Sequence, residues 1–181
     1  NEPTRADDDA AETGERRQLY AGEVSWEEAG RLIRLYKPVT TVIDGLPETK
    51  KARELQEAFR RNSIWLCYYG DGSASNKKDD YAIFNYPEGT VMADRTRSLD
   101  EMYARVHEGI NSLPGNTRTL LHYYEQIKAP VRIVEETKRG DQVVKYVEGT
   151  KKDHYAHAEV YCVLASLKAR ASGEKAGKLD Y

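Results

Sequence analysis

The sequence predicts an α/β fold with a mixed sheet flanked by helices, and three neighbouring stretches support this prediction. Residues 39–43 form a β-branched run, and residues 63–69 are almost entirely apolar, as expected of neighbouring buried strands. Residues 48–61, which lie between them, carry apolar side chains at helical spacing. A strand, a helix and a second strand in this order are typical of two parallel strands joined by a crossover helix.

Further elements follow from the same periodicities along the chain. The expected strands span residues 16–24, 39–43, 63–69, 81–86, 90–93, 131–135 and 142–147. The expected helices span residues 26–37, 48–61, 98–113, 117–128 and 150–170. Two pairs of these strands are separated by the turn sequences PEG and TKRGD, and we therefore expect them to form hairpins.

Two helix starts carry the S-x-x-E pattern of a capping box, in which the serine and the glutamate side chains each bond the other's backbone N–H. Ser25 with Glu28 and Ser98 with Glu101 match this pattern. The helix after Ser25 is expected to bury one face and to end at Pro38. The residues of that face are Ala29, Leu32, Ile33 and Tyr36.

Composition limits the functions that the chain can have. The 181 residues carry a formal net charge of −2, so binding to nucleic acid requires a local basic patch. No apolar run approaches the length of a membrane span. The expected organisation is an acidic loop or tail over residues 1–15, one domain over residues 16–170 and a polar tail over residues 171–181.

Two aspartates occupy positions at which an α/β fold can bind a ligand. Asp44 follows directly after the run of residues 39–43, at the end of the sheet where such folds bind ligands and metals. Asp153 lies in the first turn of the last expected helix. Together they offer the hard oxygen ligands that Mg²⁺ and Mn²⁺ require. The alternatives are local: Asp44 caps a turn, and Asp153 forms a T-x-x-D cap with Thr150.

Several basic side chains are candidates for contact with DNA phosphates. They lie in loops, before a helix and at a hairpin tip, and they are Lys77, Lys78, Arg95, Arg97, Lys138, Arg139, Lys151 and Lys152. Lys138 and Arg139 lie at the expected tip of the hairpin of residues 131–147, and contact with DNA there would make this hairpin a flap beside the active-site cleft. The alternatives are solvated surface charges and, for the two arginines before the helix, ion pairs with Asp94 and Asp100.

The last expected helix also carries two histidines. His154 and His157 are three residues apart and therefore share a face of the helix. No further ligands with the spacing of a zinc site accompany them. We expect His157 to face the carboxylates and to position water or a metal ligand, and the alternative is a structural histidine.

Four segments resemble, in order and spacing, the C-terminal nuclease domain of bacteriophage terminase large subunits. They are VIDGLPETKKARELQEAF, IWLCYYGD, DRTRSLDEMYARVHEGINSLP and EGTKKDHYAHAEVY, and the similarity covers roughly residues 16–168. The resemblance implies a ribonuclease-H-like fold, to which this chain adds a β-hairpin. It also implies an endonuclease that cuts concatemeric double-stranded DNA, with little sequence specificity, during viral genome packaging.

The resemblance further implies the site and the partners. That family holds two Mg²⁺ or Mn²⁺ ions with acidic residues on the first strand, at the end of the fourth strand and at the last helix. Asp44 matches the fourth-strand position and Asp153 the last-helix position. The implied partners are double-stranded DNA, an ATPase motor domain, the portal and the small terminase. The implied location is the host cell cytoplasm and, transiently, the viral procapsid.

The chain departs from the family pattern in two respects. Residues 1–15 contain no apolar strand with an aspartate, so we expect the first strand pair to be missing from this chain. No G-x-x-x-x-G-K-[ST] sequence occurs, so ATP hydrolysis through a phosphate-binding loop is excluded. Two other functions stay open: a ribonuclease-H-like nuclease of the resolvase or integrase type, and a non-catalytic module that docks on DNA or on the portal.

Overall fold

The computed structural model describes residues 16–70, 81–113, 115, 122–147 and 149–171. Its centre is a four-stranded sheet with the strand order β2-β3-β5-β4. These strands are β2 (Thr41–Asp44), β3 (Ile64–Gly70), β4 (Ala82–Asn85) and β5 (Thr90–Asp94). β2, β3 and β5 are parallel, and β4 is antiparallel to β5. The chain is therefore an α/β protein with a mixed sheet, as the sequence predicts.

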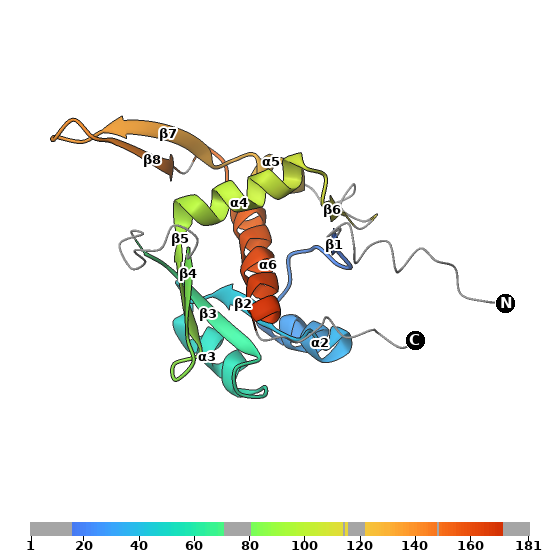
Figure 1. Cartoon of the computed structure of the whole chain (residues 1–181). Coiled ribbons are helices and arrows are strands. Elements are labelled where there is room, and N and C mark those ends of the chain that lie inside the picture. The colour runs from blue at the N-terminus through green and yellow to red at the C-terminus, as the bar shows by residue number, and fades with distance from the viewer. Residues whose placement is uncertain (1–15, 71–80, 114, 116–121, 148, 172–181) are drawn as a thin grey trace.

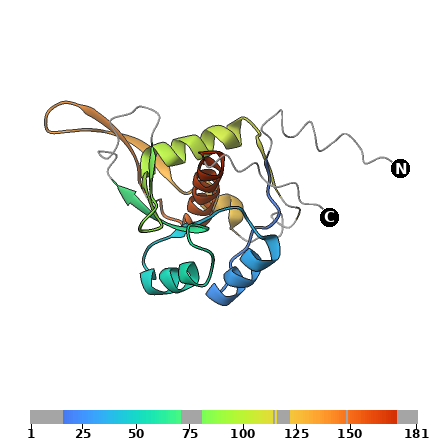
Figure 2. The same cartoon turned by 60° about the horizontal axis from the view of Figure 1, so that its bottom comes forward.

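Helices cover both faces of this sheet (Figures 1 and 2). α4 (Arg95–His107) and α6 (His154–Ala171) lie on one face. α3 (Thr49–Glu57) lies on the other, next to α2 (Trp26–Tyr36). The main core lies between the sheet and the first pair of helices. Its buried side chains are Val42, Trp65, Cys67, Val91, Ala93, Leu99, Met102, Tyr146, Ala156, Val160, Val163 and Leu164.

The two parallel strands predicted from the apolar runs both occur, but they differ in burial. The first four residues of β3, from Ile64 to Cys67, are almost inaccessible to solvent. A strand covered on both faces needs apolar residues at every position, and β3 has them. β2 begins two residues later than predicted and lies at the edge of the described sheet, so Val42 is its buried residue while Val39 is exposed.

The predicted strand over residues 16–24 is mostly wrong. Only β1 (Arg16–Arg17) forms, and it pairs in parallel with β6 (Asn111–Ser112) in a sheet of its own. Leu19, expected at the apolar centre of a strand, is half exposed. A side chain holds this segment instead, because Gln18 donates over 2.8 Å to the buried carboxylate of Glu159 in α6.

Both predicted hairpins are confirmed. β4 and β5 form the first within the main sheet, while β7 (Val131–Glu136) and β8 (Gln142–Val147) form a separate sheet that projects from the body (Figure 1). Side chains hold its base on α4. Tyr146 donates its hydroxyl to Asp100 over 2.8 Å, and Arg132 bonds the same carboxylate.

The first predicted capping box is half right. The Ser25 hydroxyl oxygen accepts from the backbone N–H of Glu28 over 3.2 Å, and α2 ends before Pro38 as expected. The Glu28 carboxylate, however, bonds the Arg31 side chain instead of returning to the cap. The predicted buried face is only partly covered, because Gly30 is the one fully buried residue of this helix.

The second predicted capping box is wrong. α4 begins at Arg95, three residues earlier than expected, because Asp94 at the end of β5 supplies the cap. The Asp94 carboxylate accepts from the backbone N–H of Arg97 over 3.0 Å. Ser98 is fully buried, and within the described part of the chain its hydroxyl has no hydrogen-bond partner.

This cap assignment predicts a contrast between two alanine substitutions. We expect Asp94→Ala to lower the free energy of unfolding by about 1 kcal/mol, because it removes the cap. We expect Ser98→Ala to leave that free energy unchanged or slightly raised, because it removes a buried hydroxyl that has no partner. Urea denaturation followed by circular dichroism measures both, and the opposite ranking would contradict the assignment.

Other predictions are either shifted or lie outside the described residues. α5 (Tyr123–Ile127) is the described part of the helix expected over residues 117–128, and α6 starts at His154 instead of residue 150. The tail of residues 1–15, the tail beyond residue 171 and the candidates Lys77 and Lys78 lie outside. None of the helices that the structure describes combines the length and the apolar character needed to cross a membrane.

Candidate active site

The carboxyl ends of the parallel strands lie at one edge of the sheet, and the start of α6 reaches the same edge. Asp44 ends β2, and Asp94 ends β5 next to the start of α4. α6 runs antiparallel to these strands, because Lys168 near its end lies over the ring of Trp65 at the start of β3. The carboxyl edge is where ligands bind in α/β sheets.

Asp153 lies directly before α6 and is buried, with 7% of its surface exposed. Its Oδ2 lies 3.4 Å from the guanidinium of Arg95 and 3.1 Å from Nε2 of His157. A buried charge is costly unless it is paired, so these two partners account for the burial of Asp153. Arg95 reaches it because β5 passes without a loop into α4.

His157 connects Asp153 to the end of β3. Its Nδ1 lies 2.7 Å from the hydroxyl of Tyr69. Because a phenol donates here, we assign Nδ1 as the acceptor and place the proton of the neutral ring on Nε2, which faces Asp153. Burial lowers the pKa of His157, and the Asp153 carboxylate opposes this effect only in part. A neutral imidazole is therefore the favoured form.

Two tyrosines extend this group toward Asp44. The rings of Tyr69 and Tyr161 stack with centroids 6.3 Å apart. Burial raises the pKa of Tyr161, and Tyr69 and the Asp44 carboxylate act in the same direction. Asp44 also has a small raising effect on the pKa of His157. The electric field of Asp44 thus acts on the residues that contact Asp153, and we call these six residues, Asp44, Tyr69, Arg95, Asp153, His157 and Tyr161, the acidic cluster.

Asp44 also caps the turn after β2, which is the alternative role that the sequence left open. One of its carboxylate oxygens accepts from the backbone N–H of Leu46 over 2.9 Å, which shapes the turn after β2. Asp44 pairs with Cys67 in the sheet register, and it therefore faces the same side as Tyr69 and α6. A carboxylate has two oxygens and about four acceptor positions, so a turn bond does not prevent it from binding a ligand.

The cluster suits a hydrated ion better than a closed metal site. Mg²⁺ is usually held by one or two carboxylates together with water and substrate phosphate, which Asp44 and Asp153 can provide. Over the described residues, no three His, Cys, Asp or Glu side chains are grouped as metal ligands. His154 is exposed while His157 is mostly buried, so the two histidines do not offer a common site for a metal ion.

The predicted DNA contacts are dispersed over the structure. Arg95 lies in the acidic cluster, and its ion pair is with Asp153 and not with Asp94 or Asp100. Arg97 lies in the first turn of α4, and Lys152 is exposed just before α6.

The three other described candidates are farther from the cluster or already paired. Lys151 forms an ion pair of 2.8 Å with Glu125. Lys138 and Arg139 lie in the turn of the β7–β8 hairpin, at the end of two six-residue strands. At about 3.4 Å per residue the turn is about 20 Å from the base of the hairpin.

Sequence analysis missed the two tyrosines of the cluster. A signal for Tyr161 existed, because it follows His157 by four residues and so lies on the same helix face. Tyr69 is two residues after Cys67 and points to the same side of the sheet, but only the structure brings its hydroxyl to His157.

The Tyr69–His157 bond predicts a difference between neighbouring tyrosines. We expect Tyr69→Phe to lower the free energy of unfolding by about 1–2 kcal/mol, because it leaves a buried imidazole nitrogen without its donor. Tyr68→Phe is the matched control, because Tyr68 points to the other side of β3, over Gly45. We expect this control substitution to change the free energy of unfolding little. Equal urea midpoints for the two variants would contradict the assigned bond.

Comparisons of the chain with family models, with curated proteins and with solved structures each find no match.

Proposed function

We propose that the chain is the metal-dependent endonuclease domain of a viral DNA-packaging terminase, with a ribonuclease-H-like fold. The observation that carries the proposal is the placement of Asp44 and Asp153, which are 109 residues apart in sequence. Asp44 ends β2 on the face of the sheet that α6 covers, and Asp153 lies directly before α6 at the same edge. The four segments that resemble terminase nucleases contain both aspartates. The reaction is hydrolysis of a phosphodiester bond in double-stranded DNA.

Five of the six cluster residues have a role in this proposal. Asp44 and Asp153 would hold Mg²⁺ or Mn²⁺, and the cation would supply Lewis-acid stabilisation of the phosphate and activation of a water. His157 orients the Asp153 carboxylate and is itself oriented by Tyr69. Arg95 places a fixed positive charge beside Asp153, where a DNA phosphate approaches.

The proposal includes a further acidic residue from a strand outside the described residues. Among the described strands, β2 has a neighbour on one side only, which is β3. A further strand that pairs with the outer side of β2 brings its own carboxylate to the same edge and completes the site for two ions. In the whole packaging machine the proposed partners are the ATPase motor domain, the portal and the small terminase, in the host cytoplasm and at the procapsid.

Cleavage of supercoiled plasmid tests this function. The 181-residue chain, and any longer form that its coding sequence provides, is incubated with plasmid in Mn²⁺, in Mg²⁺ or in EDTA. We expect nicked and linear products with little sequence preference in either metal, and none in EDTA. No cleavage by either form in Mn²⁺, or cleavage that persists in EDTA, would refute the proposal.

Two alternatives give different results in related experiments. A non-catalytic docking module is favoured by one observation, namely that the described residues contain no group of three metal ligands. Calorimetric titration with Mn²⁺ separates it from a nuclease, because a docking module takes up no ion. A strong preference for four-way junctions over linear duplex would instead indicate a resolvase.

A further inference from the structure

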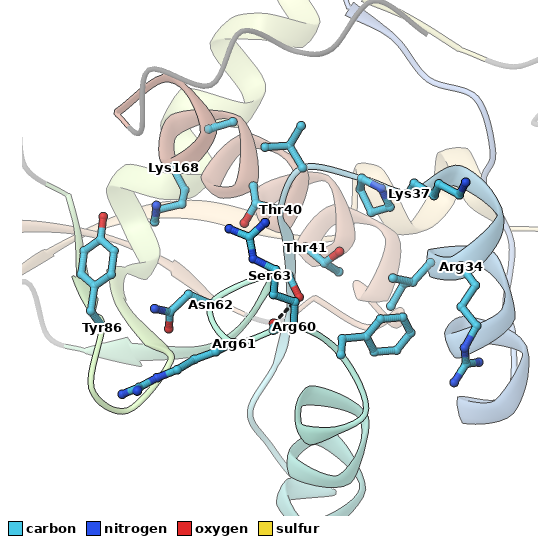
Figure 3. Close-up of a pocket in the computed structure, with 15 residues that line it drawn as sticks. Arg34, Lys37, Thr40, Thr41, Arg60, Arg61, Asn62, Ser63, Tyr86 and Lys168 are labelled. Carbon is cyan, nitrogen blue, oxygen red and sulfur yellow. Dashed lines mark hydrogen bonds between the residues drawn. The ribbon is translucent and has the colours of Figure 1, made fainter. Parts of the chain in front are cut away.

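A concave site lies at the opposite end of the sheet from the acidic cluster. It is a pocket of about 850 Å³, formed where β2 and β3 begin and where α2 and α6 end (Figure 3). Thr41 and Ser63 mark the strand starts, and Ala169 marks the end of α6. β3 contains seven residues, so the two sites are about 20 Å apart along the sheet.

The charged residues of this pocket all have the same sign. Acidic residues outnumber basic ones by 30 to 28 in the whole chain, yet among the residues that the structure describes no aspartate or glutamate lines the pocket. Three separate parts of the fold contribute cations, as Figure 3 shows. They are Arg34 and Lys37 from α2 and its C-cap, Arg60 and Arg61 from the turn before β3, and Lys168 from α6. The pocket is thus the local basic patch that nucleic-acid binding requires in a chain of negative net charge.

Two of these cations lie over aromatic rings. The guanidinium of Arg34 lies 5.0 Å from the ring centre of Phe59. The ammonium of Lys168 lies 4.9 Å from the ring centre of Tyr86 and 5.2 Å from that of Trp65. A cation–π contact fixes the position of a cation without neutralising its charge.

Four of the five cations keep their charge available. In the described parts of the chain, no carboxylate lies within ion-pair distance of Arg34, Lys37, Arg60 or Arg61. Positive charge concentrated in a concave site attracts an anion more strongly than the same charge spread over a convex surface.

Thr40 also lines the pocket. Its hydroxyl oxygen is buried and has no hydrogen-bond partner among the described residues. Because this atom is shielded from the open pocket, it adds nothing to ligand binding there, which depends on the charged side chains.

We infer that this pocket binds backbone phosphates of a nucleic acid, at a second site distinct from the acidic cluster. The five cations are more than a single small anion needs as partners, which suits a chain of several phosphates. All five are arginines or lysines, and four of them are exposed. Contacts from such charges to phosphates carry no sequence information, so we expect binding to be independent of sequence. The inference does not depend on whether the chain cuts DNA.

Binding of a fluorescent duplex of about 30 base pairs, measured by anisotropy in EDTA over a series of salt concentrations, tests the inference. The test variant is the double substitution Lys37→Gln with Arg61→Gln, because both side chains are exposed and neither makes a ring contact or an ion pair with a described residue. The matched control, Arg17→Gln with Lys50→Gln, removes the same charges from exposed positions outside the pocket.

We expect the test variant to bind the duplex about tenfold more weakly at low salt and to lower the slope of log affinity against log salt by about two. The control should retain the wild-type slope. Equal weakening in both variants, or no duplex binding by the wild-type chain, would overturn the inference.

A second arm separates nucleic acid from small phosphate ligands. Inorganic phosphate and a mononucleotide are titrated as competitors of the duplex at millimolar concentration. If the pocket variant loses mononucleotide binding but keeps full duplex affinity, the site holds a small phosphate compound and the inference is wrong. Because binding is measured without divalent metal, failure here is distinct from failure of the cleavage assay.

Discussion

Asp44→Asn is expected to slow plasmid cleavage at least about a hundredfold, which corresponds to about 3 kcal/mol of lost transition-state stabilisation. The asparagine side chain keeps the shape of aspartate, and its oxygen can still accept from Leu46, so the turn after β2 is preserved. What it loses is the negative charge that a hard cation needs. The measurement is the rate at which supercoiled plasmid disappears in Mn²⁺.

Glu57→Gln is the control for this experiment. Glu57 is exposed at the end of α3, outside the acidic cluster, and its substitution removes the same charge. The control should cut at the wild-type rate. Cleavage by Asp44→Asn at the wild-type rate would show that Asp44 is not part of the active site. An equal loss of cleavage rate in both variants would show an effect of net charge alone.

The largest effect on stability is expected from Leu164→Ala. Leu164 is completely buried in the core that α6 shares with the sheet and with α4. Truncating such a leucine costs about 3 kcal/mol or more, because transfer energy is lost and a cavity remains. That is a large share of the roughly 5–15 kcal/mol that stabilises a typical domain. The urea midpoint of unfolding measures the loss.

Leu35→Ala provides the same chemical change at an exposed position. Leu35 lies on the outer side of α2 with 59% of its surface exposed. We expect its substitution to change the free energy of unfolding by no more than about 0.5 kcal/mol. Similar midpoints for the two leucine variants would show that the core does not depend on Leu164.

The parts of the fold that the sequence predicts correctly have strong local signals. β3 is apolar at every buried position, and both hairpins contain glycine turns. The segment before α2 has apolar residues as well, yet it forms almost no strand. Its path is fixed by the bond between Gln18 and Glu159, which are 141 residues apart, and no local pattern contains that information.

The same distinction applies to the acidic cluster. Asp44 and Asp153 are recognisable because strand ends and helix starts can be inferred from periodicity. The long-range partners of Asp153 and His157 cannot be recognised in this way. Arg95 is 58 residues from Asp153, and Tyr69 is 88 residues from His157. The second capping box failed for a related reason: Asp94, at a strand end that also starts a helix, competes with Ser98 for the cap.

One guanidinium joins the projecting hairpin to the acidic cluster. Arg95 donates to the backbone carbonyl of Tyr146 in β8 over 3.1 Å and also contacts Asp153. A displacement of the hairpin that breaks the bond to Tyr146 is therefore expected to move the group that balances the charge of Asp153. Conversely, neutralising Asp153 is expected to free Arg95 and to loosen the base of the projecting arm. By linkage, the two effects must be equal in free energy.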